Sequence, residues 1–311
     1  MTEQADAASP AGGVVDAHQH IWDLCAHAQP WLELPGHEPL LRNFSEADLR
    51  PLAAAAGVTA TVVVQTVTEA SETPELLAIA AASDLIGGVV GWTDLESPAV
   101  ADALAALGEE PGGGALVGIR HPVLIETDPR WLMRPAVLSG LSAVGAAGLC
   151  YDIVVPADLL PVAAETVAAC QDVVFVLDHL GNPRVDQRAE GQPDPAWMSS
   201  IRRIAAMPNT VCKLSGILGE PRPGRPASDA RQPPGEAAGS RSVAHLVPYY
   251  ETVLSCFGPE RLMFGSDWPP CTLSASYAGV VDAARALTGS LSQGERAAIF
   301  SETARRVYRL K

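Results

Sequence analysis

Two histidines separated by one residue stand near the start of the chain, in the run Asp16-Ala-His18-Gln-His20. Side chains two positions apart project from the same side of an extended strand, so both imidazoles can meet one ligand or one water molecule. The spacing of His18 and His20 therefore predicts a functional pair. Three histidines outside such motifs are expected to be structural: His27, His37 and His245.

Two further polar motifs each follow an apolar run. Asp178 and His179 come after Val-Phe-Val-Leu, and Asp267 ends the run Leu-Met-Phe-Gly-Ser-Asp. Acids and imidazoles at the ends of buried strands are suited to proton transfer or metal binding. Asp267 could instead cap the next helix or pair with Lys213. We expect His179 and Asp267 to converge with the histidine pair.

Other side chains at the ends of apolar runs could contact a substrate. Arg120 with His121, and Lys213, offer donors for an oxyanion or a carboxylate. The alternative for both cations is internal pairing with an acid: Asp152, Asp178 or Asp16. Three tryptophans could form stacking walls for a ring-shaped substrate or serve only in packing: Trp31, Trp92 and Trp268.

Short β-branched runs, bounded by Gly, Pro or Asp, recur about every 35 residues and are typical of buried parallel strands. The eight runs begin at Gly13, Ala60, Ile86, Leu116, Leu149, Val173, Thr210 and Arg261. Helical patterns lie between them. Eight alternations of strand and helix predict a closed (β/α)8 TIM barrel, with the polar motifs on its catalytic face.

The expected organisation is a flexible N-terminal tail over 1–12 and a single barrel catalytic domain over 13–311. A Pro- and Gly-rich insertion over 220–242 interrupts the domain after the seventh strand. This insertion is either a disordered segment without function or a mobile lid over the site. Expected helix boundaries include starts at Ser45, with Asp48 as a capping-box partner, and at Ser97, and ends at Gly57, Gly108 and Gly258.

Composition excludes several classes of partner. The formal net charge is -15, which would repel nucleic acid and anionic lipid. Hydrophobic residues make up 48% of the chain, enough for a large core, but no apolar stretch is long enough to span a membrane. The N-terminal residues do not look like a secretion signal. We expect a cytoplasmic protein that acts on a small molecule and that could form a homo-oligomer.

The motifs together resemble the amidohydrolase-related family of the amidohydrolase superfamily, in its branch of L-fuconolactonases, L-rhamnonolactonases and 2-pyrone-4,6-dicarboxylate lactonases. The segments that carry the resemblance are DAHQHIWD from Asp16, PWL from Pro30, GVVGWTDL from Gly88, GIRHPV from Gly118, WLMRP from Trp131, LDHLGNP from Leu177, CKLSG from Cys212 and RLMFGSDWP from Arg261. The resemblance implies hydrolysis of a sugar-acid lactone. In that reaction Asp267 would be the general base, with His18, His20 and His179 in the water-binding cluster.

Metal-rich members of the superfamily place a bridging Lys on the fourth strand and a His on the fifth, whereas this chain has Arg120-His121 and LCYDIVV there. We therefore expect one divalent ion at most, such as zinc or manganese, bound by His18, His20 and Asp267 together with His179. Alternatively, the activity does not strictly require a cofactor. Two alternatives remain. One is a metal-dependent decarboxylase of the same superfamily, and the other is a catalytically silent barrel that binds sugar acids.

Overall fold

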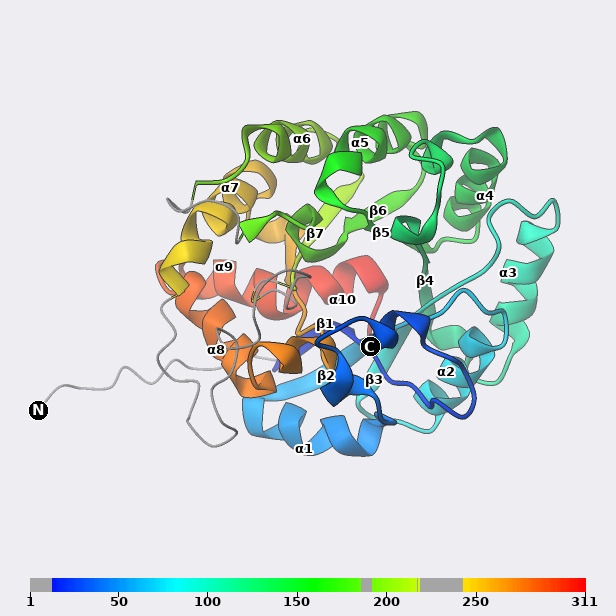
Figure 1. Cartoon of the computed structure of the whole chain (residues 1–311), viewed down its shortest axis with the longest axis horizontal. Helices are drawn as coiled ribbons and strands as arrows, with labels where there is room; N and C mark the ends of the chain where they lie inside the picture. The colour runs from blue at the N-terminus through cyan, green and yellow to red at the C-terminus, as the bar shows by residue number, and fades with distance from the viewer. Residues whose placement is uncertain (1–12, 186–191, 217, 219–242) are drawn as a thin grey trace, which may run out of the picture.

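The computed structural model describes residues 13–185, 192–216, 218 and 243–311, and shows eight parallel strands in a near-closed barrel. The strands follow one another around the barrel in chain order (Figure 1). Their bounds are β1 Val14–Gln19, β2 Val58–Val64, β3 Ile86–Gly91, β4 Leu116–Pro122, β5 Cys150–Val154, β6 Val174–Leu177, β7 Thr210–Leu214 and β8 Leu262–Phe264. The prediction of eight strands and a (β/α)8 barrel is confirmed.

Helices surround the barrel on its outside (Figure 1). They are α1 Glu46–Ala56, α2 Glu72–Ala81, α3 Val100–Glu109, α4 Pro135–Ala146, α5 Leu160–Ala169, α6 Pro195–Ala205, α7 Val247–Phe257, α8 Tyr277–Leu287, α9 Gln293–Ala297 and α10 Thr303–Tyr308. A π-helical turn, Ala298–Glu302, joins the last two. Among the described residues, none of these helices has the length and apolar character needed to cross a bilayer.

The helix boundaries show where local sequence signals hold. Ser45 caps α1 with a capping box, and Gly57 ends that helix in the left-handed conformation, as expected. Gly258 likewise follows α7. The predicted start at Ser97 is wrong, because its hydroxyl accepts a hydrogen bond from the Ala99 amide and closes a turn before α3 begins. The end predicted at Gly108 is also wrong, since Gly108 lies inside α3.

The barrel interior changes character along its axis. An apolar cluster fills the barrel interior below the carboxyl ends of the strands, and Tyr308 and Leu310, near the end of the chain, belong to it. Its members on the strands are Val15, Ala17, Ala60, Val62, Val64, Val90, Cys150, Val176, Val211 and Met263. Above this cluster the inward side chains are polar or charged. A larger apolar cluster packs the outer faces of the strands against the helices. The polar site therefore rests on a close-packed core, which limits its freedom to move.

The seam between the first and last strands brings together the two ends of the predicted motif set. Gln19 pairs in parallel with Trp268, the His20 amide donates to the Trp268 carbonyl at 2.7 Å, and the Asp267 amide donates to the His18 carbonyl at 2.8 Å. These bonds hold Asp267 beside the histidine pair. The expected tail over 1–12 and the insertion over 220–242 lie outside the described residues.

Candidate active site

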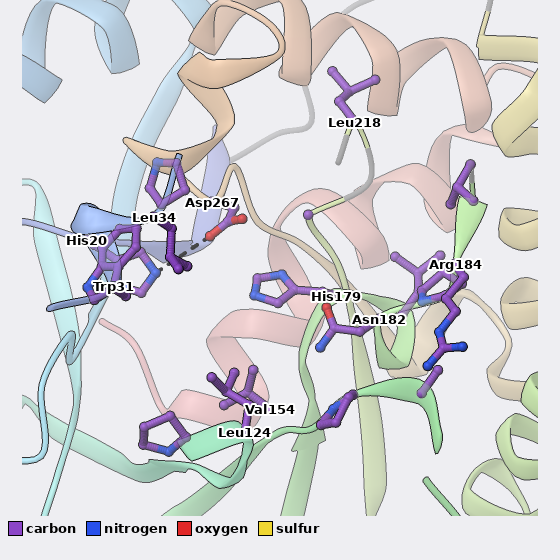
Figure 2. Close-up of a pocket in the computed structure, with 18 of the residues that line it drawn as sticks. His20, Trp31, Leu34, Leu124, Val154, His179, Asn182, Arg184, Leu218 and Asp267 are labelled. Carbon is purple, nitrogen blue, oxygen red and sulfur yellow. Dashed lines mark ion pairs between the residues drawn. The ribbon is translucent and has the colours of Figure 1, made fainter. Parts of the chain in front are cut away.

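A cavity of about 830 Å³ opens at the carboxyl ends of the strands. Figure 2 shows His20 and Asp267 on one side of it, with Trp31 and Leu34 close to His20, and His179 facing them. Asn182 and Arg184 lie beyond His179. Loops that follow several different strands contribute to the wall, which is where a (β/α)8 barrel carries its chemistry.

His18 and His20 approach each other through their Nε2 atoms, which are 3.2 Å apart. His20 is fixed by a bond of 2.8 Å between its Nδ1 and the Val64 carbonyl. Because a carbonyl oxygen only accepts, the His20 proton lies on Nδ1 and its Nε2 presents a lone pair. The register of β1 against β2 shifts between Asp16 and Gln19, next to this pair. The predicted convergence of the two imidazoles is confirmed.

His179 reaches the site through an unusual backbone. It has φ 53°, and Leu180 and Asn182 are also in the left-handed region. Such residues are strained, and the surroundings must hold them. The Trp197 indole donates to the Leu180 carbonyl at 2.9 Å, and the side-chain amide of Asn182 donates to the Val155 carbonyl at 2.8 Å. The turn is therefore fixed by neighbouring elements.

The His179 ring also needs space and a partner. Its Nδ1 lies 2.9 Å from the Ser215 hydroxyl, and its ring centroid is 4.5 Å from that of His18. A Cβ on Gly216 would lie 2.8 Å from the His179 ring, so this position requires glycine. Gly265 is equally constrained, because a Cβ there would lie 2.7 Å from the Cβ of His18. Two glycines thus let the two histidines approach neighbouring strands.

Asp267 occupies the seam with φ 58°. Its Oδ1 lies 3.6 Å from Nε2 of His20 and 3.8 Å from Nε2 of His18. It is 8% exposed and lines the cavity, so a bound water or substrate can reach it. Burial raises the pKa of the Asp267 carboxyl above its usual value, against the opposing effect of His179 and Arg120.

A charged layer lies directly beneath these groups. Lys213 is fully buried, with Nζ 2.6 Å from Asp152 Oδ2, 3.1 Å from Asp178 Oδ1 and 3.0 Å from His18 Nδ1. Arg120 lies 3.3 Å from the other Asp178 oxygen and donates to the Gln65 carbonyl at 2.6 Å. The internal pairing considered for both cations is confirmed, with Asp152 and Asp178 as the partners.

Burial and this charged layer together set the protonation states of the histidines and of Asp178. Burial lowers the pKa of His18 well below its usual value, lowers that of His179, and lowers that of His20 to about 3. Burial alone would raise the pKa of Asp178, but Lys213 and His18 beside it hold that pKa well below its ordinary range. At neutral pH the three histidines are therefore uncharged, and Asp178 is an anion.

Several predicted contact residues lie away from the cavity. His121 accepts a hydrogen bond from the Trp92 indole at 3.0 Å, stacks on Trp131 at 4.1 Å, and does not line the described cavity. Adjacent strand residues face opposite sides, so Arg120 points inward while His121 points toward the helices. Trp268 is 1% exposed and packs on Phe44. Lys213 is buried below the site, as described above. Arg120 and Trp31 do line the cavity.

Other lining residues were not among the predicted site residues. His37 and His245 were expected to be structural, yet both line the cavity, as do Thr66, Asn182 and Arg184. His37 and His245 lie in loops far apart in the sequence and belong to no motif, so only the fold brings them together. Asn182 belongs to the LDHLGNP motif, and its position three residues after the strand-end His179 was the available signal.

The donor set fits one divalent ion. His18, His20 and Asp267 each offer one ligand atom, and these atoms are 3.2 to 3.8 Å apart. Ligands about 2.0 to 2.1 Å from a tetrahedral zinc ion would be separated by about 3.3 Å. His20 already presents a lone pair at Nε2. His18 presents one only in the tautomer whose Nδ1 donates to Asp178 Oδ1, 3.3 Å away, whereas the Lys213 ammonium, 3.0 Å from the same Nδ1, can only donate and favours the other tautomer.

Known proteins share both the sequence and the fold. The L-fucono-1,5-lactonase of Burkholderia multivorans is 36% identical over 95% of this chain and 96% of that protein, and the one of Burkholderia ambifaria is 31% identical over 85% and 82%. A Burkholderia multivorans amidohydrolase crystallised with bound zinc superposes with a TM-score of 0.84 at 32% identity, covering 96% and 99% of the two chains.

More distant structures share only the fold. A 2-pyrone-4,6-dicarboxylic acid hydrolase from Pseudomonas putida, described as putative, gives a TM-score of 0.70 at 20% identity, covering 96% of this chain and 97% of that one. A model of the amidohydrolase family matches residues 15–310. This range contains the carboxyl ends of all eight strands and every site residue described above. Given this match and the near relatives, the chain belongs to the amidohydrolase family.

Proposed function

We propose that this protein hydrolyses the ring ester of a sugar-acid lactone, as the names of the similar Burkholderia enzymes state for L-fucono-1,5-lactone. One observation carries the proposal. A buried carboxylate of raised pKa, Asp267, lines the cavity between two uncharged imidazoles, His20 and His179, with the Arg120 guanidinium on the same lining. That arrangement suits a general base beside a fixed positive charge.

In the proposed reaction, Asp267 accepts a proton from a water molecule, and the water oxygen attacks the lactone carbonyl carbon. The raised pKa makes Asp267 a stronger base than an exposed aspartate, and a lactone is a reactive ester. Arg120 stabilises the negative charge that develops on the carbonyl oxygen. The bond between the carbonyl carbon and the ring oxygen then breaks.

The departing ring oxygen needs a proton. His121, expected from the sequence to donate to the substrate, lies outside the described cavity lining. We assign this step to protonated Asp267, which returns the proton it took from water. The products are the open hydroxy acid and the regenerated carboxylate, so one lactone and one water are consumed. His20 and His179, which line the cavity, orient the water through their ring nitrogens, and the fully buried His18 contacts His20 through Nε2.

A divalent ion on His18, His20 and Asp267 would polarise the water or the carbonyl oxygen. We propose that the reaction does not strictly require this ion. The Arg120 Nη1 atom lies 3.4 Å from His18 Nε2, so a positive charge already stands beside the same donor set. A second cation there would meet that charge, which weakens the binding of the ion.

The test is base uptake in a pH-stat on a panel of 1,4- and 1,5-lactones of sugar acids, before and after exhaustive chelation, with metal content measured on the same samples. Acid release from a lactone is the expected result. Carbon dioxide release from an aromatic or enoic acid would instead identify a decarboxylase. Tight binding of a sugar acid without turnover of any lactone would identify a silent binding barrel, and either result would overturn the proposal.

A further inference from the structure

Trp31 forms part of the cavity wall beside His20 (Figure 2). It lies in a short 3₁₀ turn, Pro30–Glu33, in the long connection between β1 and α1. Its indole edge meets Trp22 and His37 in edge-to-face contacts, with ring centroids 5.5 and 5.9 Å away. A single 3₁₀ turn cannot fix the ring by itself, so its position depends on contacts with other elements.

A hydrogen-bond relay connects Trp31 to α2. The Trp31 indole N–H donates to Gln29 Oε1 at 2.8 Å, and Gln29 Nε2 donates to the Thr66 hydroxyl at 2.7 Å. Thr66 in turn donates its hydroxyl proton to Glu72. Glu72 is 3% exposed, and its carboxylate also accepts from the backbone amides of Thr66 and Val67.

The direction of every bond in this relay is fixed by chemistry. An indole N–H can only donate, so the Gln29 oxygen must face Trp31 and its NH₂ must face Thr66. Thr66 has one hydroxyl proton, which it donates to the Glu72 carboxylate, so the lone pairs of the Thr66 hydroxyl oxygen can accept from Gln29. No other arrangement satisfies all the polar atoms of this buried group, and leaving one unpaired is costly.

A second contact joins the same two loops. His27 lies with Nδ1 2.7 Å from Glu69 and Nε2 3.1 Å from Glu75, so the connection after β1 is held against the segment around α2 at two points. His27 sits on the outer side, where the carboxylates of Glu69 and Glu75 are about half exposed. The Gln29 relay is the inner contact, and it is the one that reaches the cavity.

We infer that Gln29, Thr66 and Glu72 are positioning residues that hold Trp31 as a stacking wall for the substrate ring. This inference rests on the proposed lactonase function. In this inference Glu72, a buried acid that is not one of the reacting groups, affects how tightly the substrate binds. Because Trp31 takes no part in the proposed proton transfers, loss of the relay should weaken substrate binding more than it slows the chemical step.

The experiment compares Thr66→Val, which has nearly the same shape but no hydroxyl, with Thr66→Ser, which keeps the relay. Thr288→Val is the matched control, since Thr288 is buried at the far end of α8 and bonds only to its own helix. We expect Thr66→Val to raise KM about three- to tenfold with kcat changed less than about twofold, because Gln29 Nε2 loses its neutral hydrogen bond to the Thr66 hydroxyl. The same substitution also removes the hydroxyl's bond to Glu72. Thr66→Ser and Thr288→Val should keep the wild-type KM.

A second readout does not depend on turnover. The six tryptophans give separate indole signals in a ¹⁵N-labelled sample, and Trp31→Phe identifies the signal of Trp31. In Thr66→Val that signal should shift and its hydrogen exchange should accelerate, while the other signals stay in place and show that the protein is folded. Because Thr66 itself lines the cavity, an unchanged Trp31 signal in Thr66→Val would overturn the inference whether or not KM rises. A wild-type protein that opens no lactone would reject the proposed function but leave the relay testable by these signals.

Discussion

Replacing Asp267 by Asn tests the proposed base with little disturbance of the structure. Asn is among the residues that tolerate the left-handed backbone found there, at φ 58°. The backbone bonds to the His18 carbonyl and from the Cys271 amide do not involve the side chain. The amide has the same shape as the carboxylate and removes only the charge and the basic lone pair. The variant should fold with a melting temperature close to that of the wild type.

The expected loss of activity follows from the role assigned to the carboxylate. A positioned general base contributes about 10² to 10⁴ in rate, equivalent to about 2.7 to 5.5 kcal/mol at the transition state. We therefore expect kcat/KM for lactone hydrolysis to fall by that factor. The upper part of the range is favoured, because His20 and His179 have lowered pKa values and are poor substitutes as bases.

The pH dependence gives an independent check. Burial raises the pKa of Asp267, and only its deprotonated form acts as base. Wild-type kcat/KM should therefore fall as the pH is lowered through this raised pKa, whereas the residual activity of Asp267→Asn should lose that acid limb. Initial rates in a pH-stat, or with a pH indicator for the acid product, measure both.

Asp282→Asn is the matched control, since its side chain is 66% exposed on α8 and pairs only with Arg285 at 3.4 Å. It should leave kcat/KM unchanged. Metal content must be measured on every sample, because Asp267 also belongs to the donor set for an ion. If Asp267→Asn kept more than about a tenth of the wild-type kcat/KM with the same acid limb, the assignment of the base would be wrong.

Three further predictions concern the buried charges and the ion. Lys213→Met should lower the free energy of unfolding by about 3 to 5 kcal/mol in urea titrations, because Asp152 and Asp178 lose their shared cation; a loss below about 1 kcal/mol would contradict this. Burial raises the pKa of Asp16 to about 6, so the folded state holds a proton that the unfolded chain releases; stability should fall by up to about 3 kcal/mol as the pH rises from about 4 to 6, and Asp16→Asn should reduce that slope. Chelation should leave lactone turnover within about twofold, and a loss restored by zinc would show that the ion is required.

The fold could be predicted because the barrel repeats one signal eight times. Each strand is a short, mostly apolar run and most are rich in β-branched residues, so errors in one unit do not change the architecture. Helix boundaries were less predictable. Ser97 carries a capping signal, yet it lies three residues before the first residue of α3, and its hydroxyl closes a turn there. A cap and a turn use the same side-chain bond, and the sequence does not distinguish them.

The site was predictable where residues share a motif. His18 with His20, and Asp267 at the end of the last run, could be placed because strand ends on one face of a barrel meet. His121 could not be placed, since a shift of one position along a strand reverses the side that a residue faces. Thr66, which lines the cavity, was not found because it belongs to no motif, and Glu72 was not found because it connects to the cavity wall only through Thr66 and Gln29.

The charged layer explains how this barrel keeps neutral histidines beside a basic carboxylate. Burial by itself would favour uncharged forms of all the acids and imidazoles here. Lys213 and Arg120 keep Asp178 ionised, and His18 receives opposing effects from Lys213 and Asp178. Asp267 lies farther from Lys213, at the cavity surface, so burial dominates and its pKa rises. Two aspartates that each follow an apolar strand thus have opposite shifts, and only Asp267 is left able to take a proton from water.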